Sequence, residues 1–371
     1  MNSNLKYEDF ALLLALQTDP FMPMTELADR LNISRITAKK RIENLKERGI
    51  IRNPIAVYNP RNLGLKRVNI CTSVASMHAL KVLETACEEH PYTRYRVRIF
   101  GGGFGLFIQF DIPHDLTPLL KEFFDKLQTE QVIETYDIFD STGLRADTFP
   151  DLSRFDPSLS SWDFSWKTWF NSLSQFSSEV PSLVESEADY SSFNPKNFKI
   201  LRLLTSNASL RQVDIRKQLS LSRTEAYRQY NYVMNNYIDK IRLIYNREIF
   251  GLTETYIAFG HPVKLENAAQ LYHAIKENPP PFRLSVDISK DDRIHLWANM
   301  STAQASAFAF SVWEKLVNIQ IYTLDTRSSE TSFLYWFYPD NFDFDEMKWR
   351  TSRAYVVDDP LDRTYTKFRN S

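Results

Sequence analysis

The stretch LADRLNISRITAKKRIENLKERGIIRNPIAVYNPRNLGL, residues 27–65, decides the fold of the N-terminal part of the chain. Ser34 stands directly before a helical pattern and can cap it, because its hydroxyl can accept a hydrogen bond from an unpaired backbone N–H of the first turn. Ala38, Ile42 and Leu45 follow at helical spacing and predict the buried side of this helix. The stretch therefore contains an amphipathic helix with a defined start.

The residues on either side of this helix complete a larger motif. Residues 7–17 predict a buried helix that ends before Pro20, and residues 27–31 predict a short second helix. Gly49 ends the third helix, and residues 51–58 predict a strand that starts a wing. Three helices followed by such a strand are typical of a winged helix-turn-helix.

The side of the third helix opposite its apolar stripe is rich in cations. Between residues 24 and 67 there are eleven Lys/Arg and four Asp/Glu, although the whole chain has a net charge of −1. A DNA major groove admits one α-helix, and Lys and Arg beside it neutralise phosphates. The alternative is a solvated helix face, which the complete motif disfavours. The candidate DNA-binding residues of this helix are Ser34, Arg35, Ile36, Thr37, Lys39, Lys40, Arg41 and Asn44.

The quoted stretch resembles the DNA-binding domain of the Lrp/AsnC (feast/famine) transcription regulators, in a tandem-duplicated, archaeal-like form. The specific part is the Gly-Ile-Ile end of the helix, the short strand, and the Pro-containing turn into Leu-Gly-Leu. The resemblance places five residues where the family meets DNA: Arg35, Ile36, Thr37, Lys39 and Lys40. Pro23 and Met24 depart from the family pattern, since they stand where a polar cap of the second helix is usual.

A second domain is expected at residues 67–140. Its patterns give strands at 68–76, 94–99, 104–110 and 134–139, with helices after the first and third, which is the ferredoxin-like order βαββαβ. The resemblance implies a ligand-sensing and oligomerising domain. Gly101, Gly102 and Gly103 favour a tight hairpin turn over a ligand loop, and we keep them as weak effector-binding candidates. Arg94, Arg96 and Arg98 are expected on an exposed sheet face, with an anion or acidic partner as the alternative.

The chain carries this order of elements twice. LNISRITAKKRI from Leu31 parallels LSLSRTEAYRQY from Leu219, and NPRNLGL from Asn59 parallels NREIFGL from Asn246, at offsets of 188 and 187 residues. Ser222 is again a cap, with Glu225 completing a capping box. The second exposed face is less basic and more aromatic, so DNA contact, weak binding and a packing surface all remain open. Its candidate DNA-binding residues are Ser222, Arg223, Thr224, Tyr227 and Arg228.

The predicted fold class is α+β, with two tandem copies of a winged helix-turn-helix followed by a ferredoxin-like domain. Each copy ends in a tail of aromatics spaced by Asp, expected to lie across its own domain or the other copy, and residues 172–192 are the expected flexible linker. The predicted boundaries are 1–66 and 196–254 for the winged helices, 67–140 and 255–335 for the ferredoxin-like domains, and 141–195 and 336–371 for the tails.

Several classes of function are disfavoured by what the sequence contains. Cys71 and Cys87 are the only cysteines, no apolar run is long enough to span a membrane, and no secretory signal is recognisable, so we expect a cytoplasmic protein. The six histidines have no metal-ligand spacing, and no nucleophile elbow or phosphate loop occurs. We therefore expect no enzyme, no metal and no cofactor.

The sequence thus predicts a transcription regulator that binds double-stranded DNA as a single-chain pseudo-dimer, with a small-molecule effector and homo-oligomerisation through the ferredoxin-like domains as further expectations. Two alternatives stay open. Siroheme decarboxylases are similar to this regulator family, so an enzyme on the same scaffold is one. A DNA-binding adaptor that recruits another factor through the aromatic tails is the other.

Overall fold

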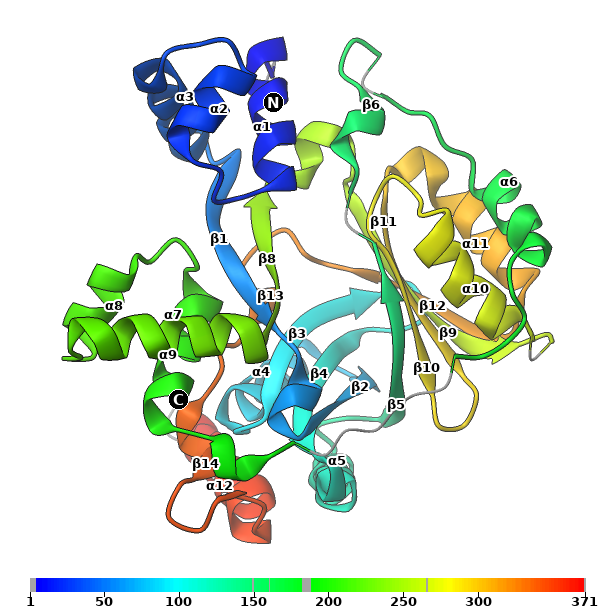
Figure 1. The fold of residues 1–371 in the computed structure, drawn as a ribbon. Coiled ribbons are helices and arrows are strands. Elements are labelled where there is room, and N and C mark those ends of the chain that lie inside the picture. Colours follow the sequence, from blue (N-terminus) through cyan, green and yellow to red (C-terminus); the bar gives the residue numbers. More distant parts are fainter. Residues whose placement is uncertain (1–4, 149, 160, 182–187, 265, 370–371) are drawn as a thin grey trace. The chain divides into compact units, whose positions relative to one another are not determined.

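The computed structural model describes residues 5–148, 150–159, 161–181, 188–264 and 266–369. It divides into two compact units, each of which combines segments from both halves of the chain (Figure 1). The first contains residues 1–59, 151–163 and 193–253, and the second contains residues 60–150, 164–192 and 254–371. Of the expected linker, residues 182–187 lie outside the described residues.

The first unit contains the same order of three helices and a strand twice. The first set is α1 (Tyr7–Thr18), α2 (Met24–Arg30), α3 (Arg35–Glu47) and β1 (Ile51–Tyr58). The second set is α7 (Pro195–Ser206), α8 (Gln212–Gln218), α9 (Arg223–Asn236) and β8 (Ile238–Tyr245). Ala38 and Leu45 of α3 and Val233 of α9 are fully buried, as their helical spacing predicts.

β1 and β8 form a two-stranded antiparallel ribbon, seen side by side in Figure 1. The expected strand at 51–58 is confirmed, but β1 pairs with β8 of the second set and not with a strand that follows it directly. Ile51 pairs with Tyr245 and Tyr58 pairs with Ile238, which lie 187 residues after Tyr58 and Ile51 respectively. The ribbon is therefore self-complementary, as at a two-fold axis.

The second unit contains two successive series of strand, helix, strand, strand, helix and strand. The first is β2 (Leu65–Ser73), α4 (Met77–Glu89), β3 (Thr93–Phe100), β4 (Gly105–Pro113), α5 (Thr117–Thr129) and β5 (Thr135–Asp147). The second is β9 (Glu254–Pro262), α10 (Glu266–Glu277), β10 (Leu284–Ser289), β11 (Ile294–Met300), α11 (Ala305–Trp313) and β12 (Leu316–Leu324). β5 is longer than the expected 134–139, because Gly143 takes a positive φ of 81° and the strand continues beyond it.

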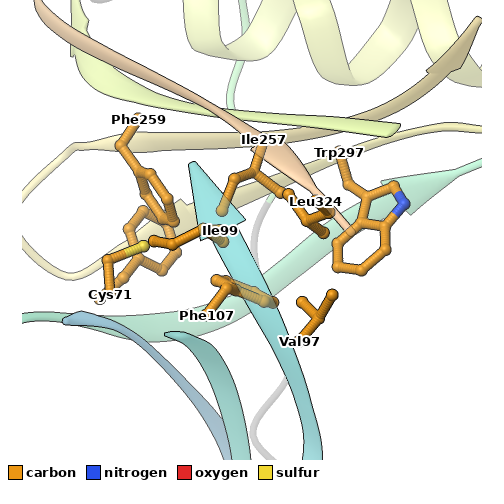
Figure 2. Close-up of a cluster of buried hydrophobic side chains, with 9 residues drawn as sticks. Cys71, Val97, Ile99, Phe107, Ile257, Phe259, Trp297 and Leu324 are labelled. Carbon is orange, nitrogen blue, oxygen red and sulfur yellow. The ribbon is translucent and has the colours of Figure 1, made fainter. Parts of the chain in front are cut away.

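These strands form one sheet that closes on itself. The order is β12-β9-β11-β10-β5-β2-β4-β3-β13, where β13 is Ser332–Leu334, and β12 also pairs with β3. The two series thus meet at two seams, β5 with β10 and β3 with β12. A buried apolar cluster fills part of the interior and draws residues from both series (Figure 2). Its members are Cys71, Val97, Ile99, Phe107, Phe139, Ile257, Phe259, Trp297 and Leu324.

The expectation that Arg94, Arg96 and Arg98 form an exposed sheet face is wrong. Arg94 and Arg96 are buried, and Arg94 donates to the carbonyl oxygen of Tyr335. Arg96 and Arg98 both donate to the Glu84 carboxylate of α4, at 3.1 and 2.9 Å. The helix and the C-terminal segment cover this face, so the row of cations is satisfied inside the protein.

Each aromatic tail forms a small hairpin and a helix. The first tail has β6 (Phe155–Asp156), β7 (Ser161–Trp162) and α6 (Trp166–Asn171), and the second has β14 (Phe342–Asp343), β15 (Lys348–Trp349), a π-helical turn at Ala354–Asp358 and α12 (Asp359–Arg369). Trp166 lies 4.9 Å from Phe308 of α11 between ring centroids, and α12 packs on α4. Each tail therefore covers helices of the other series.

Within the described residues, no helix is long and apolar enough to cross a membrane, and no group of three or more His, Cys, Asp or Glu could hold a metal ion.

Candidate nucleic-acid interface

The start of α3 is fixed by its own sequence. The backbone N–H of Thr37 donates to the Ser34 hydroxyl at 3.1 Å, so the predicted cap is confirmed. The two hydroxyl oxygens of Ser34 and Thr37 also lie 2.9 Å apart. The cap leaves the first turn ordered and exposed, with the remaining N–H groups and the positive end of the helix dipole directed outward.

Cationic side chains surround this exposed turn. Arg35 and Lys40 are exposed, and neither forms an ion pair within the described residues. Lys39 lies 3.8 Å from Glu43, but its side chain is 71% exposed, so solvent weakens that pair. These three cations can meet phosphate oxygens without first giving up a buried partner.

Two other candidates on α3 hold the helix in place. Arg41 is largely covered and lies 3.8 Å from Glu8 of α1. Asn44 accepts a hydrogen bond from Arg48 at 3.3 Å, and Arg48 also donates to the buried Asp9 at 3.2 Å. Their contacts orient α3 against α1, so a positioning role fits them better than direct contact with DNA.

Ile36 completes the exposed face with an apolar side chain. It is 71% exposed on the first turn of α3. In a major groove such a side chain can pack on a thymine methyl group, while the neighbouring cations hold the backbone. The face therefore combines one apolar contact with several charged ones.

The second recognition helix, α9, keeps the geometry of the first and changes its chemistry. Ser222 again caps, with the Glu225 N–H donating to its hydroxyl at 3.2 Å. Arg223, Thr224 and Arg228 are exposed, and Tyr227 is 60% exposed. Tyr227 lies 188 residues after Lys39, so an uncharged ring replaces a cation at the matching position of the face.

A carboxylate lowers the charge of this second face further. Glu225 accepts a hydrogen bond from Lys196 of α7. That bond is the main reason why the pKa of the Glu225 carboxyl lies below its ordinary value, and the Ser222 N–H acts in the same direction, as the predicted capping box requires. The carboxylate is therefore ionised beside Arg228, where the first helix carries no acidic group in its first turn.

The three glycines proposed as a weak effector site form the turn between β3 and β4. Gly101 and Gly103 have φ values of 109° and 152°, which explains glycine at both positions. A Cβ added to Gly102 would lie 3.1 Å from the Tyr322 ring of β12. The turn thus packs closely on a neighbouring strand, and effector binding there stays a prediction.

Sequence reasoning did not single out two further cations of the first unit. Arg30 at the end of α2 and Arg52 at the start of β1 are both exposed and form no ion pair within the described residues. The local excess of positive charge was the available signal, but charge alone does not say which residues of a segment stay in solvent.

Comparison with known proteins supports the reading of the N-terminal segment. Residues 9–52 match the family model described as winged helix-turn-helix DNA-binding. Over 62 residues, 17% of this chain, the sequence is 39% identical to the HTH-type transcriptional regulator LrpA of Pyrococcus horikoshii. Over 56 residues, 15% of this chain, it is 36% identical to an uncharacterised HTH-type transcriptional regulator of Haemophilus influenzae.

The matches cover 44% and 33% of those two relatives, so the chain spans less than half of either. The N-terminal segment is therefore a winged helix-turn-helix of Lrp/AsnC type, and the expected DNA-binding and transcription-regulation character is supported there.

A solved structure is similar over almost the whole chain. The crystal structure of the siroheme decarboxylase NirDL matches with a TM-score of 0.53, covering 98% of this chain and 99% of that one. The sequences are 15% identical, so the likeness shows a shared fold.

Proposed function

We propose that the protein is a transcription regulator that binds double-stranded DNA through α3, with Arg35, Lys39 and Lys40 on the phosphate backbone and Ile36 and Thr37 at base edges. The observation that carries this proposal is the capped, exposed and cationic first turn of α3, in a segment that matches a DNA-binding family model. Ser34 acts as the cap that orders the turn.

We propose further that the chain arose by tandem duplication and acts as a single-chain pseudo-dimer with two ferredoxin-like domains. The repeated order of elements and the self-complementary β1–β8 ribbon support this. In a symmetric dimer the two half-sites of a DNA target are equal. Here the faces of α3 and α9 differ, so the preferred target has unequal half-sites.

The test is DNA retardation with the Lys39→Ala/Lys40→Ala double variant across a range of salt concentrations. We expect weaker binding to all sequences and a salt dependence whose slope falls by about 2, because each phosphate contact adds about 1 to it. The matched control is Lys264→Ala, an exposed lysine of the other unit whose side chain is 71% accessible. Unchanged affinity and slope would rule out α3 as the DNA-binding helix.

A second candidate function, an enzyme acting on siroheme, is favoured by the match over the full chain to a siroheme decarboxylase. Incubation with siroheme separates the two candidates. A new Soret band without any DNA retardation would favour the enzyme, whereas retardation without spectral change favours the regulator. Retardation of every DNA sequence to the same degree would favour a DNA-binding adaptor instead.

A further inference from the structure

The closed sheet of the second unit has two seams that hold matching positions in the two series. Cys71 pairs with Phe107, which pairs with Val97, across β2, β4 and β3. Phe259 pairs with His295, which pairs with Asp287, across β9, β11 and β10. Since the strand order is the same in both series, His295 stands where the first series has Phe107, and Asp287 stands where it has Val97.

The two seams differ in chemistry. At the β3–β12 seam the buried side chains are Val97, Ile99 and Leu324, which belong to the apolar cluster. At the β5–β10 seam they are polar. The buried polar residues there are Ser141 of β5 and Ser285, Asp287 and Ser289 of β10, with exposures of 5, 3, 3 and 1%.

Burial of polar groups costs free energy unless each finds a partner. The first seam shows that an apolar pair of strands closes this sheet without that cost. A polar seam is therefore not needed for folding, and its hydrogen-bond donors and acceptors should have a use.

Several donors at the polar seam lack partners. Gln109 donates to the Asn69 carbonyl oxygen at 2.9 Å, so the Asn69 amide nitrogen faces Nδ1 of His295 at 3.5 Å. Nδ1 must then accept, and the proton of the neutral imidazole sits on Nε2. Within the described residues, this buried Nε2 has no hydrogen-bond partner, nor do Nε1 of Trp297 and Nε of Arg145.

These groups come from neighbouring strands. Arg145, Asp287 and His295 lie in one register row across β5, β10 and β11, and Trp297 follows His295 on the same face of β11. The Arg145 side chain is 27% exposed, so the row reaches solvent at one end. In Figure 2 the nitrogen-bearing edge of Trp297 faces away from the other labelled side chains.

We propose that the β5–β10 seam is a binding site for a small organic carboxylate. The three unpaired N–H donors require acceptor oxygens, and the Arg145 guanidinium favours an anion. Asp287 is held by the Ser141 hydroxyl beside them. Burial raises the pKa of Asp287 and lowers the pKa of His295 to about 3, so the site keeps a neutral imidazole and resists ionisation of Asp287. The site is distinct from the turn at Gly101–Gly103.

The test uses the full chain with 15N-labelled Trp and His, titrated with acetate, pyruvate and benzoate against sodium chloride of equal ionic strength. We expect one or more carboxylates to shift the Trp297 Nε1 and His295 Nε2 resonances saturably, because both N–H groups gain an acceptor. Chloride should not do so.

Two variants place the other seam's residues here and so should still fold. His295→Phe and Asp287→Val copy Phe107 and Val97, and each should abolish the saturable shift of the Trp297 resonance. Ile99→Val, in the apolar seam, should leave it intact. The proposal is overturned if none of the three carboxylates moves either resonance at saturating concentration, which would leave water as the partner, or if His295→Phe binds like the unchanged protein.

Discussion

His90, at the end of α4, is a buried imidazole with only one nitrogen in use. Its Nδ1 accepts from the Tyr92 N–H at 3.2 Å, and its Nε2 has no partner within the described residues. The rings of Phe110 and Phe123 lie 5.0 and 4.9 Å away. Burial is the main cause that lowers the pKa of His90 from 6.5 to about 3, with Arg363 adding to it.

The shift fixes a direction of pH dependence. Below pH 6.5 the unfolded chain binds a proton that the folded imidazole refuses, so His90 contributes its full stability above pH 6.5 and loses it as the pH falls towards 3. The loss is about 1.4 kcal/mol per pH unit in that window. His90→Asn can still accept from Tyr92 but does not titrate, so we expect a shallower slope in urea unfolding between pH 6 and about 4. His78→Asn, at an exposed position, should keep the original slope.

Single residues were predictable from sequence where the interaction is local. The caps Ser34 and Ser222 bond to backbone three residues away, so their position before a helix was sufficient evidence. Partners distant in sequence were not predictable. Lys196 lies 29 residues before Glu225, and Arg96 meets Tyr335 across 239 residues. No pattern within either segment specifies such pairs.

The two tail hairpins make matching hydrogen bonds. The Trp162 indole N–H donates to the Phe250 carbonyl at 2.7 Å, and the Trp349 indole N–H donates to the Leu63 carbonyl at 2.9 Å. Both the donors and the acceptors lie 187 residues apart. Each tryptophan thus ties its tail to the other copy, directly before the Gly-Leu pair that leads into a long strand.

Replacement of these tryptophans should destabilise the protein. Trp349 is 4% exposed, so Trp349→Phe keeps most of the packing and should cost about 1 kcal/mol for the lost hydrogen bond. Trp349→Ala also leaves a cavity and should cost about 3–5 kcal/mol. Trp162→Phe is the matched variant and should cost no more than Trp349→Phe, because Trp162 is only partly buried. Equal unfolding free energies for Trp349→Ala and the unchanged chain would show that the tail is not bound in solution.

Most elements were predictable because hydrophobic periodicity reports which face is buried. Strand partners were not, since periodicity says nothing about which neighbour covers an edge. β1 was expected to begin a wing, yet its edge is taken by β8. The arginines of β3 alternate as an exposed face would, but α4 supplies Glu84 to two of them. The tails carried an aromatic signal without an address.

At the scale of the molecule, each unit is built around a two-fold relation between unlike halves. In the first unit, the Asn59 N–H donates to the Tyr237 carbonyl at 3.0 Å, and the Asn246 N–H donates to the Ile50 carbonyl at 2.8 Å. These bonds exchange places under the 187-residue offset. The framework has thus stayed symmetric while exposed faces and one interior seam have diverged, which is expected if separate tasks have been assigned to the halves.

A single substitution tests whether this divergence sets the binding of DNA. Tyr227→Lys gives α9 the cation that α3 carries as Lys39, at a position 60% exposed where a lysine meets no steric obstacle to solvent. If both helices lie on DNA, the added phosphate contact should tighten binding at low salt and steepen the salt dependence by about 1. Tyr227→Phe adds no charge and should leave the slope unchanged. A slope that Tyr227→Lys does not move would place α9 away from the phosphate backbone and leave α3 as the helix responsible for binding.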